Sequence, residues 1–551
     1  MVARLLFLCA VGAACTRTSA APTSRPPPAA KPAPAPAPAP EWPVPVRVLV
    51  RTASGDIEVR GTLPPPPGHV IALPDGDRWF VEPLDLDLDD REMAALVDEV
   101  NRHRIPGLSL RGARHLGDRQ LARLSRLRGV RVLDLTGTRV TGTGLAGLDR
   151  LADLRGLYLA GTQVKDDDLA SLAARHPALE AIDLQGCAVG DAGVRALAAL
   201  PLRQIGLAST GITDSGADAL RAHTARLTSL DLGETNVGDA GLAWLANATS
   251  LVDLGLWRTQ VTNKLLPLLQ YARRLASLDL SETAIDDAGI ATLHKTGVLY
   301  RLTSLDISTT KVSDKSGMYL LSPLQLESLD IGGTRIGNRG VAVVSNLTHL
   351  RFLSLRRLKF EEYHLADFTN LKAMRHLDLG ETGVTSDVAQ HLDRMTELSE
   401  LYLDVTSIED DAVVAIAARH PALRVLHLDD NALGPAAARA LASLISLTEL
   451  TLGETGLTQV QVASIVAALP ELEVLDLSSL QLTDAMAPAI AQRVHLHTLD
   501  LSKNDITDAG LAALEPLKRL RVLGLQSTRV KRTRAEIMAA FPNLEDAVTD
   551  R

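Results

Sequence analysis

Cysteine and aromatic residues are scarce in this chain, and both shortages restrict how it can fold. Only 3 of the 551 residues are cysteines, and Phe, Trp and Tyr together make up 3% of the sequence. Cys9 lies in an apolar leader, so Cys187 has no partner if Cys15 is acylated or removed. The fold therefore uses no intrachain disulfide. Its core must be built from many similar layers of Leu, Ala and Val.

A net positive charge and catalytic motifs are lacking as well. The formal net charge of −9 disfavours a sequence-independent nucleic-acid binder, so we expect no nucleic-acid partner. The chain contains no G-x-S-x-G, no phosphate-binding glycine loop and no paired cysteine spacing for zinc. His495 and His497, and His427 near Asp429, supply neither a third metal ligand nor a base with an orienting partner. We therefore predict no enzyme activity, no metal and no cofactor.

The first residues resemble an export signal. Arg4 supplies a positive charge, and residues 5–14 are an apolar stretch that is too short to span a bilayer as a helix. Two cleavage sites fit. "GAAC" resembles a bacterial lipobox, although Gly12 departs from the usual Leu or Val, and would make Cys15 the lipidated first residue of the mature chain. "TSA" at 18–20 suits an ordinary signal peptidase. We favour lipidation, which predicts a place at the outer membrane, the cell surface or the periplasm, whereas the other site predicts secretion.

Residues 16–45 are rich in Pro and Ala and include "PPPAAKPAPAPAPAPEWP". Such a segment cannot form a helix or pack a core, and it is expected to be a semi-rigid tether of about 3.1 Å per residue. A tether after a lipidated cysteine would hold a domain away from the membrane. The predicted attachment is thus a lipid anchor within residues 1–15 rather than a transmembrane helix.

From about residue 105 the chain repeats the frame L-x-x-L-x-L-x-x-T-x-V/I, a short polar piece and an apolar, helix-like piece. The frame occurs eighteen times, mostly 24 or 25 residues apart, and its second leucine position is filled by Leu108, Leu133, Leu157, Ile182, Ile205, Leu230, Leu254, Leu278, Leu305, Leu329, Leu353, Leu377, Leu401, Leu426, Leu450, Leu475, Leu499 and Leu523. This frame resembles the leucine-rich repeat family. The "T-x-I-T-D-A-G-L" variant is similar to repeats of bacterial exported proteins and lipoproteins, and to F-box-associated repeats.

The residues of one unit explain the expected fold. In "LTSLDLGET" the L-x-L motif has period two, so Leu230 and Leu232 face one side of a strand and Asp231 faces the other. "VGDAGLAWLANA" then changes to helical spacing. One strand and one short helix cannot bury their apolar faces alone, so the units must stack. We predict an α/β leucine-rich repeat solenoid, or horseshoe, with a parallel sheet on the concave face and helices on the convex face.

Polar positions of the frame are given structural roles. Asp239 and its equivalents in "TDAG" are predicted to be helix N-caps. Thr235 and its equivalents are predicted to satisfy a buried amide or carbonyl at the turn. Leu358 and Leu480 take the place of this Thr and cannot do so, which predicts local disorder or a bound water at those two turns.

Other segments are expected to seal the array. Residues 46–88 alternate and turn at Gly and Pro, which predicts a β-rich N-terminal cap. The repeat domain is predicted over 89–545, opening with a convex helix at 89–104. Residues 546–551 are a polar tail.

The outward position between the two strand leucines is a candidate binding surface. It holds Asp231, Asp378 and Tyr402, and at Asp279, Asp306 and Asp330 three carboxylates occupy successive strands, about 4.8 Å apart. The row is either an ordinary solvated face or a patch for a basic segment of a protein partner. A divalent cation is a further alternative, although carboxylates on a flat sheet do not wrap an ion.

Trp and Arg, which anchor many interfaces, flank this row. Trp257 and Arg258 lie on one side, and Arg356 and Arg357 on the other. The unit "LSLRRLKFEEYHLADF" departs most from the frame, with Phe352 and Tyr363 where other units have small residues. It is either a seam between two sub-arrays or a contact site.

Two functions are compatible with these patterns. The first is an exported, membrane-tethered scaffold that binds a protein or a glycan on its concave face. The second, implied by the F-box resemblance, is a substrate-recognition subunit of a ubiquitin-ligase-like system. The second needs a helical adaptor motif before the repeats, where 46–83 instead favour strands.

Overall fold

The chain folds into two compact units, residues 1–244 (unit 1) and 245–551 (unit 2), which are described separately. The computed structural model describes residues 42, 44–51, 57–64, 74, 79–86, 88–321, 325–541 and 543–550. The predicted export signal, the lipidation site Cys15 and most of the 16–45 linker lie outside these residues. Within the described ranges, no helix is long and apolar enough to cross a bilayer.

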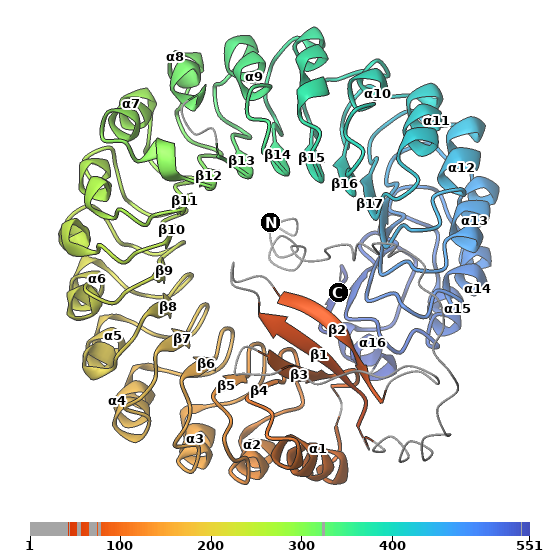
Figure 1. Cartoon of the computed structure of the whole chain (residues 1–551). Coiled ribbons are helices and arrows are strands. Elements are labelled where there is room, and N and C mark those ends of the chain that lie inside the picture. Colours follow the sequence, from red (N-terminus) through yellow and green to blue (C-terminus); the bar gives the residue numbers. More distant parts are fainter. Residues whose placement is uncertain are drawn as a thin grey trace, which may run out of the picture. The chain divides into compact units, whose positions relative to one another are not determined.

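Unit 1 is a row of short strands covered on one side by short helices (Figure 1). Its strands are β1 (Val46–Arg51), β2 (Ile57–Leu63), β3 (Trp79–Pro83), β4 (Gly107–Ser109), β5 (Val132–Asp134), β6 (Gly156–Tyr158), β7 (Ala181–Asp183), β8 (Gln204–Gly206) and β9 (Ser229–Asp231). Its helices are α1 (Asp90–Arg102), α2 (Asp118–Leu124), α3 (Gly142–Leu145), η1 (Ala146–Leu148), α4 (Asp166–Arg175), α5 (Asp191–Ala196), η2 (Leu197–Ala199), α6 (Asp214–Ala219) and η3 (Leu220–His223).

Unit 2 repeats this arrangement. Its strands are β10 (Asp253–Gly255), β11 (Ser277–Asp279), β12 (Ser304–Asp306), β13 (Ser328–Asp330), β14 (Phe352–Ser354), β15 (His376–Asp378), β16 (Glu400–Tyr402), β17 (Val425–His427), β18 (Glu449–Thr451), β19 (Val474–Asp476), β20 (Thr498–Asp500), β21 (Val522–Gly524) and β22 (Asp546–Val548). Its helices are η5 (Leu266–Tyr271), α7 (Asp287–Lys295), η6 (Leu299–Arg301), α8 (Asp314–Gly317), η7 (Met318–Leu321), α9 (Asn338–Val344), η8 (Glu362–Asn370), α10 (Val388–His391), α11 (Asp410–Arg419), α12 (Pro435–Leu441), α13 (Gln459–Ala468), η9 (Asp484–Met486), α14 (Ala487–Ile490), α15 (Asp508–Ala513) and α16 (Arg534–Ala540). The remaining 3-10 helix, η4 (Ala243–Asn247), contains the division between the units.

Every predicted strand centre lies in a strand, so the α/β solenoid is confirmed within each unit. Neighbouring strands are parallel and in register, as in the pairs Leu133–Leu157 of unit 1 and Leu278–Leu305 of unit 2. Residues 546–548, which the sequence placed in a tail, form one more parallel strand, β22, beside β21. Ala547 occupies the leucine position there, which is why the leucine frame did not indicate it.

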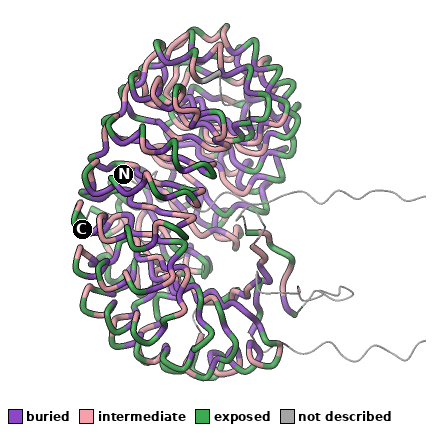
Figure 2. Tube along the Cα trace, turned by 60° about the vertical axis from the view of Figure 1, so that its left-hand side comes forward, coloured by how far each residue is buried: buried purple, intermediate pink, exposed green. Residues whose placement is uncertain are grey.

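The core of each unit lies between its strands and its helices. Leu230 and Leu232 are 1% and 0% exposed, whereas Asp231 between them is only half-buried. The period-two assignment of the strand faces is therefore confirmed. Buried and exposed stretches alternate in this way along the coils (Figure 2). The face of the sheet that the helices do not cover is called the inner face below.

The N-terminal segment covers the first strand of the array in unit 1. β1 pairs antiparallel with both β2 and β3, and β3 continues parallel into β4. Trp42 stacks on His103 at 5.2 Å between ring centroids, and Val44 is buried. Packed residues thus begin inside the segment that composition assigned to the linker. α1 starts within one residue of the predicted helix, where Asp89 and Glu92 form a reciprocal capping box.

The prediction that the "TDAG" aspartates are N-caps is wrong, because these residues lie one position further along. In α6 the N-cap is Thr213, whose hydroxyl accepts the N–H of Ser215. The carboxylate of Asp191 in the preceding coil accepts the N–H of Thr213 at 2.8 Å and its hydroxyl at 2.7 Å. The aspartate of one coil therefore fixes the residue that opens the helix of the next coil. The same bond joins Asp118 to Thr141, Asp166 to Gly190, Asp214 to Gly238, Asp287 to Ser313, Asp314 to Gly337, Asp410 to Gly434, Asp484 to Thr507 and Asp508 to Lys531.

This bond between coils explains why a Gly stands two positions after the aspartate in the "TDAG" motif. A Cβ on Gly216 would lie 2.5 Å from Oδ1 and 3.2 Å from Cα of Asp191. We expect Gly216→Ala to lower the free energy of unfolding by about 1–2 kcal/mol, because Asp191 must shift away from Thr213. The loss should exceed the gain of about 1 kcal/mol in helix propensity.

Denaturant unfolding of Gly216→Ala and of a control variant measures this loss. Gly211→Ala, in the same coil, is the matched control, since its nearest atom beyond its chain neighbours is the carbonyl oxygen of Val189 at 3.4 Å. Equal losses for Gly216→Ala and Gly211→Ala would contradict the explanation.

The predicted role of the turn threonine is confirmed. Thr235 Oγ1 donates to the carbonyl of Leu232 at 2.6 Å, and eleven other turns have the same bond. The prediction of disorder or water is wrong at the Leu480 turn, where Asn504 also donates to the carbonyl of Leu477, and it stays a prediction at the Leu358 turn. Asn504 of the next coil accepts the N–H of Leu480 at 3.1 Å, and the N–H of Leu358 donates to Leu355 at 3.0 Å. A neighbouring coil can supply the polar group that Leu480 lacks.

Candidate functional site

All but one of the predicted concave-face binding residues lie in unit 2. The exception, Asp231, ends β9 of unit 1, where its carboxylate accepts the N–H of Gly233 at 2.9 Å. The same i to i+2 bond is made by Asp134 and Asp183 at the equivalent places in β5 and β7. In unit 1, Tyr158 of β6 and Gly206 of β8 take this position on the strands between the aspartates. Each aspartate therefore chiefly stabilises the turn that follows its own strand.

In unit 2 the corresponding carboxylates come together on the inner face. Asp279, Asp306 and Asp330 end β11, β12 and β13 and are direct register partners. These three residues are called the acidic row. Each accepts the N–H of the residue two places later, at 2.8–2.9 Å. Neither Asp306 nor Asp330 forms an ion pair within the described part of the chain.

The acidic row resists full ionisation. Burial, and then the negative charges of Asp330 and Asp279, hold the pKa of Asp306 well above its ordinary range. Burial also raises the pKa of Asp330 to about 7, with a further contribution from Asp378. Neighbouring carboxylates that share a site cannot all be charged without a nearby cation. At neutral pH the row therefore keeps protons that exposed aspartates would have lost.

Asp330→Asn is expected to raise the free energy of unfolding by about 1–2 kcal/mol at pH 8 and to leave it unchanged near pH 4. The folded pKa of about 7 lies above the ordinary value of 3.8. The contribution of Asp330 to the free energy of unfolding of the wild type is therefore fully present at low pH. It is lost as the pH rises from about 4 to about 7. Asn keeps an oxygen for the Gly332 amide and carries no charge.

Thermal and urea unfolding across this pH range measure the effect. Asp134→Asn in β5, which has no carboxylate at the equivalent place on either adjacent strand, is the control. If Asp330→Asn raised the free energy of unfolding equally at pH 4 and pH 8, the pKa of Asp330 would not differ between the folded and unfolded chain.

The predicted flanking arginines are occupied by other carboxylates. Arg356 pairs with Asp404, with Glu381 at 2.9 Å and with Asp378 at 3.5 Å. Arg357 pairs with Glu381 at 2.7 Å. The charges of Asp404, Asp378 and Glu381 raise the pKa of Arg356 although its burial alone would lower it. Arg356 is thus the centre of an ion-pair network next to the acidic row.

The other flank has a similar arrangement. Arg258 pairs with Glu282 at 2.8 Å. Trp257 precedes it at the exit of β10 and is half-buried. The arginines of both flanks are therefore paired with glutamates that follow neighbouring strands.

A continuous line of rings crosses the inner face beside this network. Phe352 stacks on His376 with 4.1 Å between ring centroids, His376 lies 4.7 Å from Tyr402, and Tyr402 lies 4.4 Å from His427. These four residues, on β14 to β17, are called the ring ladder. The ladder combines two of the chain's few Phe and Tyr residues with two histidines on four adjacent strands.

Two glutamates border the ring ladder. His376 Nδ1 is 2.7 Å from Glu400, and His427 Nε2 is 2.8 Å from Glu449. Although burial alone would lower it, the hydrogen bond and charge of Glu449 raise the pKa of His427. Burial, with the charges of Glu400 and Glu449, raises the pKa of Tyr402, so its ring stays a neutral phenol. The ladder therefore offers aromatic surface with carboxylates at its edge.

The structure excludes one of the two interpretations of the divergent unit, and the other stays a prediction. A seam at Phe352 is wrong, because β14 continues the register of β13 and β15, and the division of the chain lies at Trp244. The contact-site interpretation remains. Tyr363, the other aromatic singled out there, is exposed on η8 and lies 4.1 Å from the His364 ring rather than joining the ladder.

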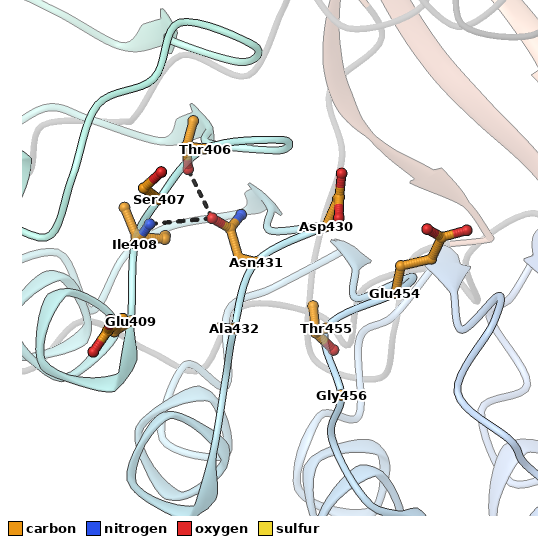
Figure 3. Close-up of a pocket in the computed structure, with 10 residues that line it drawn as sticks. All are labelled: Thr406, Ser407, Ile408, Glu409, Asp430, Asn431, Ala432, Glu454, Thr455 and Gly456. Atoms are coloured by element: carbon orange, nitrogen blue, oxygen red, sulfur yellow. Dashed lines mark hydrogen bonds between the residues drawn. The ribbon is translucent and has the colours of Figure 1, made fainter.

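A shallow hollow of about 530 Å³ opens among the turns that follow β16, β17 and β18 (Figure 3). Its polar lining includes Glu409, Asp430 and Glu454, and Asn431 accepts from Thr406 and from the Ile408 amide there. Val405, next to the Arg356 partner Asp404, is 45% exposed and has φ of 53°. The equivalent turn residues Glu381, Asp430 and Glu454 also have positive φ, so this backbone conformation belongs to the repeat and does not by itself mark a binding surface.

Sequence inspection missed His376, Glu400, Glu449 and Asp404. The sequence prediction of the acidic row used the position between the strand leucines, whereas the first outward position of the strands holds Phe352, His376, Glu400 and Glu449. Reading that second position would have found the bordering groups. Among the described residues, no three carboxylate, histidine or cysteine side chains are grouped closely enough to hold a metal ion.

Comparisons with known proteins concern the repeat. A leucine-rich repeat family model matches residues 176–198, 226–246 and 494–514. No curated protein matches the chain.

Several solved structures are similar. An internalin from Listeria monocytogenes is 22% identical, with 66% of this chain and 88% of that chain covered and a TM-score of 0.37. A leucine-rich repeat protein of Leptospira interrogans is 18% identical, with 78% and 92% covered and a TM-score of 0.32. The mouse RP105/MD-1 complex is 16% identical, with 79% and 87% covered and a TM-score of 0.37.

Proposed function

This chain is a leucine-rich repeat protein, and we propose that it is a binding scaffold that holds a protein partner on the inner face of unit 2. The observation that carries this proposal is the ring ladder of Phe352, His376, Tyr402 and His427 next to the acidic row. Aromatic rings concentrated in a partly buried patch are typical of interface anchors. Neither feature is needed to close the turns or the core, since unit 1 does both without them.

The partner is expected to present Lys or Arg side chains. Asp306 and Asp330 hold protons at the cost of folding stability, and a cation placed between them would let them ionise. The rings of Tyr402 and Phe352 offer cation–π contacts to the same side chains. Arg356 does not compete for the acidic row, because Asp404, Glu381 and Asp378 already hold it.

We also propose that the protein is exported and held at a membrane through a lipid on Cys15. This rests on "GAAC" and on the Pro/Ala-rich tether after it. Metabolic labelling with palmitate should mark the wild type and not Cys15→Ser, and the wild type should fractionate with the envelope. Absence of both label and envelope fractionation would remove the export proposal. The ubiquitin-ligase alternative needs a helical adaptor, and the described residues between 46 and 83 form β1, β2 and β3.

Binding of a fluorescent deca-arginine peptide to the full chain tests the inner-face proposal. The triple variant Asp279→Asn, Asp306→Asn, Asp330→Asn should weaken binding at least about tenfold at pH 8 and low salt. The matched triple Asp134→Asn, Asp183→Asn, Asp231→Asn removes the same charge from the same strand positions of unit 1. It should change binding by less than about twofold. Equal losses in the two triples would mean that net charge alone attracts the peptide.

A further inference from the structure

Unit 2 has a second aromatic cluster, on its outer, helical side, that the inner-face proposal does not use. Three of the six tyrosines of the chain, Tyr271, Tyr300 and Tyr319, lie in η5, η6 and η7, which contact α7 or α8. His294 of α7 lies 5.5 Å from the Tyr300 ring and 4.8 Å from the Tyr319 ring. Tyr271 is 48%, Tyr300 54% and Met318 66% exposed. Large apolar side chains are thus turned to solvent on three consecutive coils.

Cations are interleaved with these side chains. Arg273, Arg274 and Lys295 are exposed, and none of the three forms an ion pair with a described residue. Arg301 donates to the carbonyl of Leu269 at 2.9 Å, which joins the second coil to the first. Burial, and then the charge of Arg273, lowers the pKa of Arg301. Positive charges are therefore crowded here without compensation.

The sequence segments that carry this cluster also lack acidic residues. The stretches 264–278, 288–305 and 315–326, which carry the cluster, contain no Asp or Glu, although the chain as a whole has a net charge of −9. The acids of these coils lie elsewhere. Asp287, for example, is bonded to Ser313 at the opposite end of α7, and Asp306 lies on the inner face. Charge is thus segregated between two sides of one set of coils.

We propose that this surface binds the face of an anionic phospholipid bilayer. The tyrosine–cation patch is defined by Tyr271, Arg273, Arg274, Lys295, Tyr300 and Met318. Tyrosine rings combine an apolar body with a hydroxyl that suits the headgroup region, and Arg and Lys can extend their charged ends to lipid phosphates. The patch consists of exposed rings and cations on the helical side of three coils, a composition that suits a lipid headgroup surface.

The proposal does not depend on the inner-face site. It concerns the opposite side of the helices, and it holds whether or not Cys15 carries a lipid. A patch that attracts the bilayer would orient the coils so that the acidic row points away from the membrane. An anionic surface would repel the rest of this acidic chain, so the patch would have to supply the attraction.

Co-sedimentation with vesicles tests the proposal, using the full chain with Cys15→Ser so that no lipid can be attached there. The protein should bind vesicles that contain phosphatidylglycerol and not vesicles of phosphatidylcholine alone. Each basic residue near an anionic surface contributes roughly a fivefold gain in partitioning. The triple Arg273→Glu, Arg274→Glu, Lys295→Glu should therefore reduce binding about a hundredfold or more.

A matched triple, Lys372→Glu, Arg394→Glu, Arg439→Glu, makes the same charge change at exposed positions of unit 2 away from the patch. It should retain most of the binding. Tyr271→Ser with Tyr300→Ser should lower the binding that persists at high salt, where charge is screened. The proposal is overturned if the parent protein does not bind phosphatidylglycerol vesicles, or if the control triple loses binding as fully as the patch triple.

Discussion

Leu232→Asp is expected to unfold the coils around β9, at a cost of about 4–5 kcal/mol. Leu232 is 0% exposed and lies between the strands and helices of unit 1. The substitution removes a large apolar side chain from a packed core and leaves a carboxylate there without a cation. Because each coil of a solenoid is stabilised by its neighbours, the loss should spread to adjoining coils rather than remain at one residue.

Asp231→Ala, one residue away, is the matched control. Its carboxylate is half-buried on the inner face and accepts the amide of Gly233, so the expected cost is about 1 kcal/mol. Hydrogen exchange resolved by segment measures which coils open in each variant, and circular dichroism measures the total loss. If Asp231→Ala unfolded these coils and Leu232→Asp did not, the two faces of the strand would have been assigned in reverse.

Arg356→Ala is the second change with a large expected effect, a loss of about 3 kcal/mol near pH 7. It leaves Asp378 and Asp404, which are 5% and 7% exposed, without the guanidinium that neutralises them. Removing one partner of a buried ion pair is more costly than replacing the whole pair. The adjacent Arg357→Ala is the control, and its cost should be below about 0.5 kcal/mol because its pair with Glu381 is exposed.

Two further measurements identify the cause. Adding Asp378→Asn and Asp404→Asn to Arg356→Ala should recover most of the lost stability, since no uncompensated charge then remains. The single variant should also be least destabilised at low pH, where the orphaned carboxylates are protonated. A loss that is the same at all pH values and is not recovered by the two amides would assign Arg356 a packing role instead.

The coil architecture could be predicted because one frame repeats with little variation. Leu230 and Leu232 specify a strand face in each coil, and a period of two leaves no other assignment. What could not be predicted depends on contacts between coils. The aspartate bonded across coils, Asp191, is the same residue type that would cap its own helix, and only the fold shows that Thr213 of the next coil is its partner.

The candidate site was predictable only in part, for a related reason. The acidic row follows from strand register alone, so Asp306 and Asp330 were correctly placed as neighbours. The partner of Arg356 is a residue 48 positions away, Asp404, two strands along the sheet. The ring ladder also changes from the first to the third position of the strand between His376 and Tyr402, so no single column of the repeat reveals it.

Calorimetric titration of the deca-arginine peptide at pH 7, in two buffers of different ionisation enthalpy, tests the central claim most directly. If the inner face of unit 2 receives a cationic partner, binding must drive protons off Asp306 and Asp330, whose folded pKa values are raised. The wild type should release about one proton per peptide bound. The variant with Asp279, Asp306 and Asp330 changed to Asn should release none from this site and bind more weakly. Binding by the wild type without proton release, or with the same release in the variant, would contradict the account.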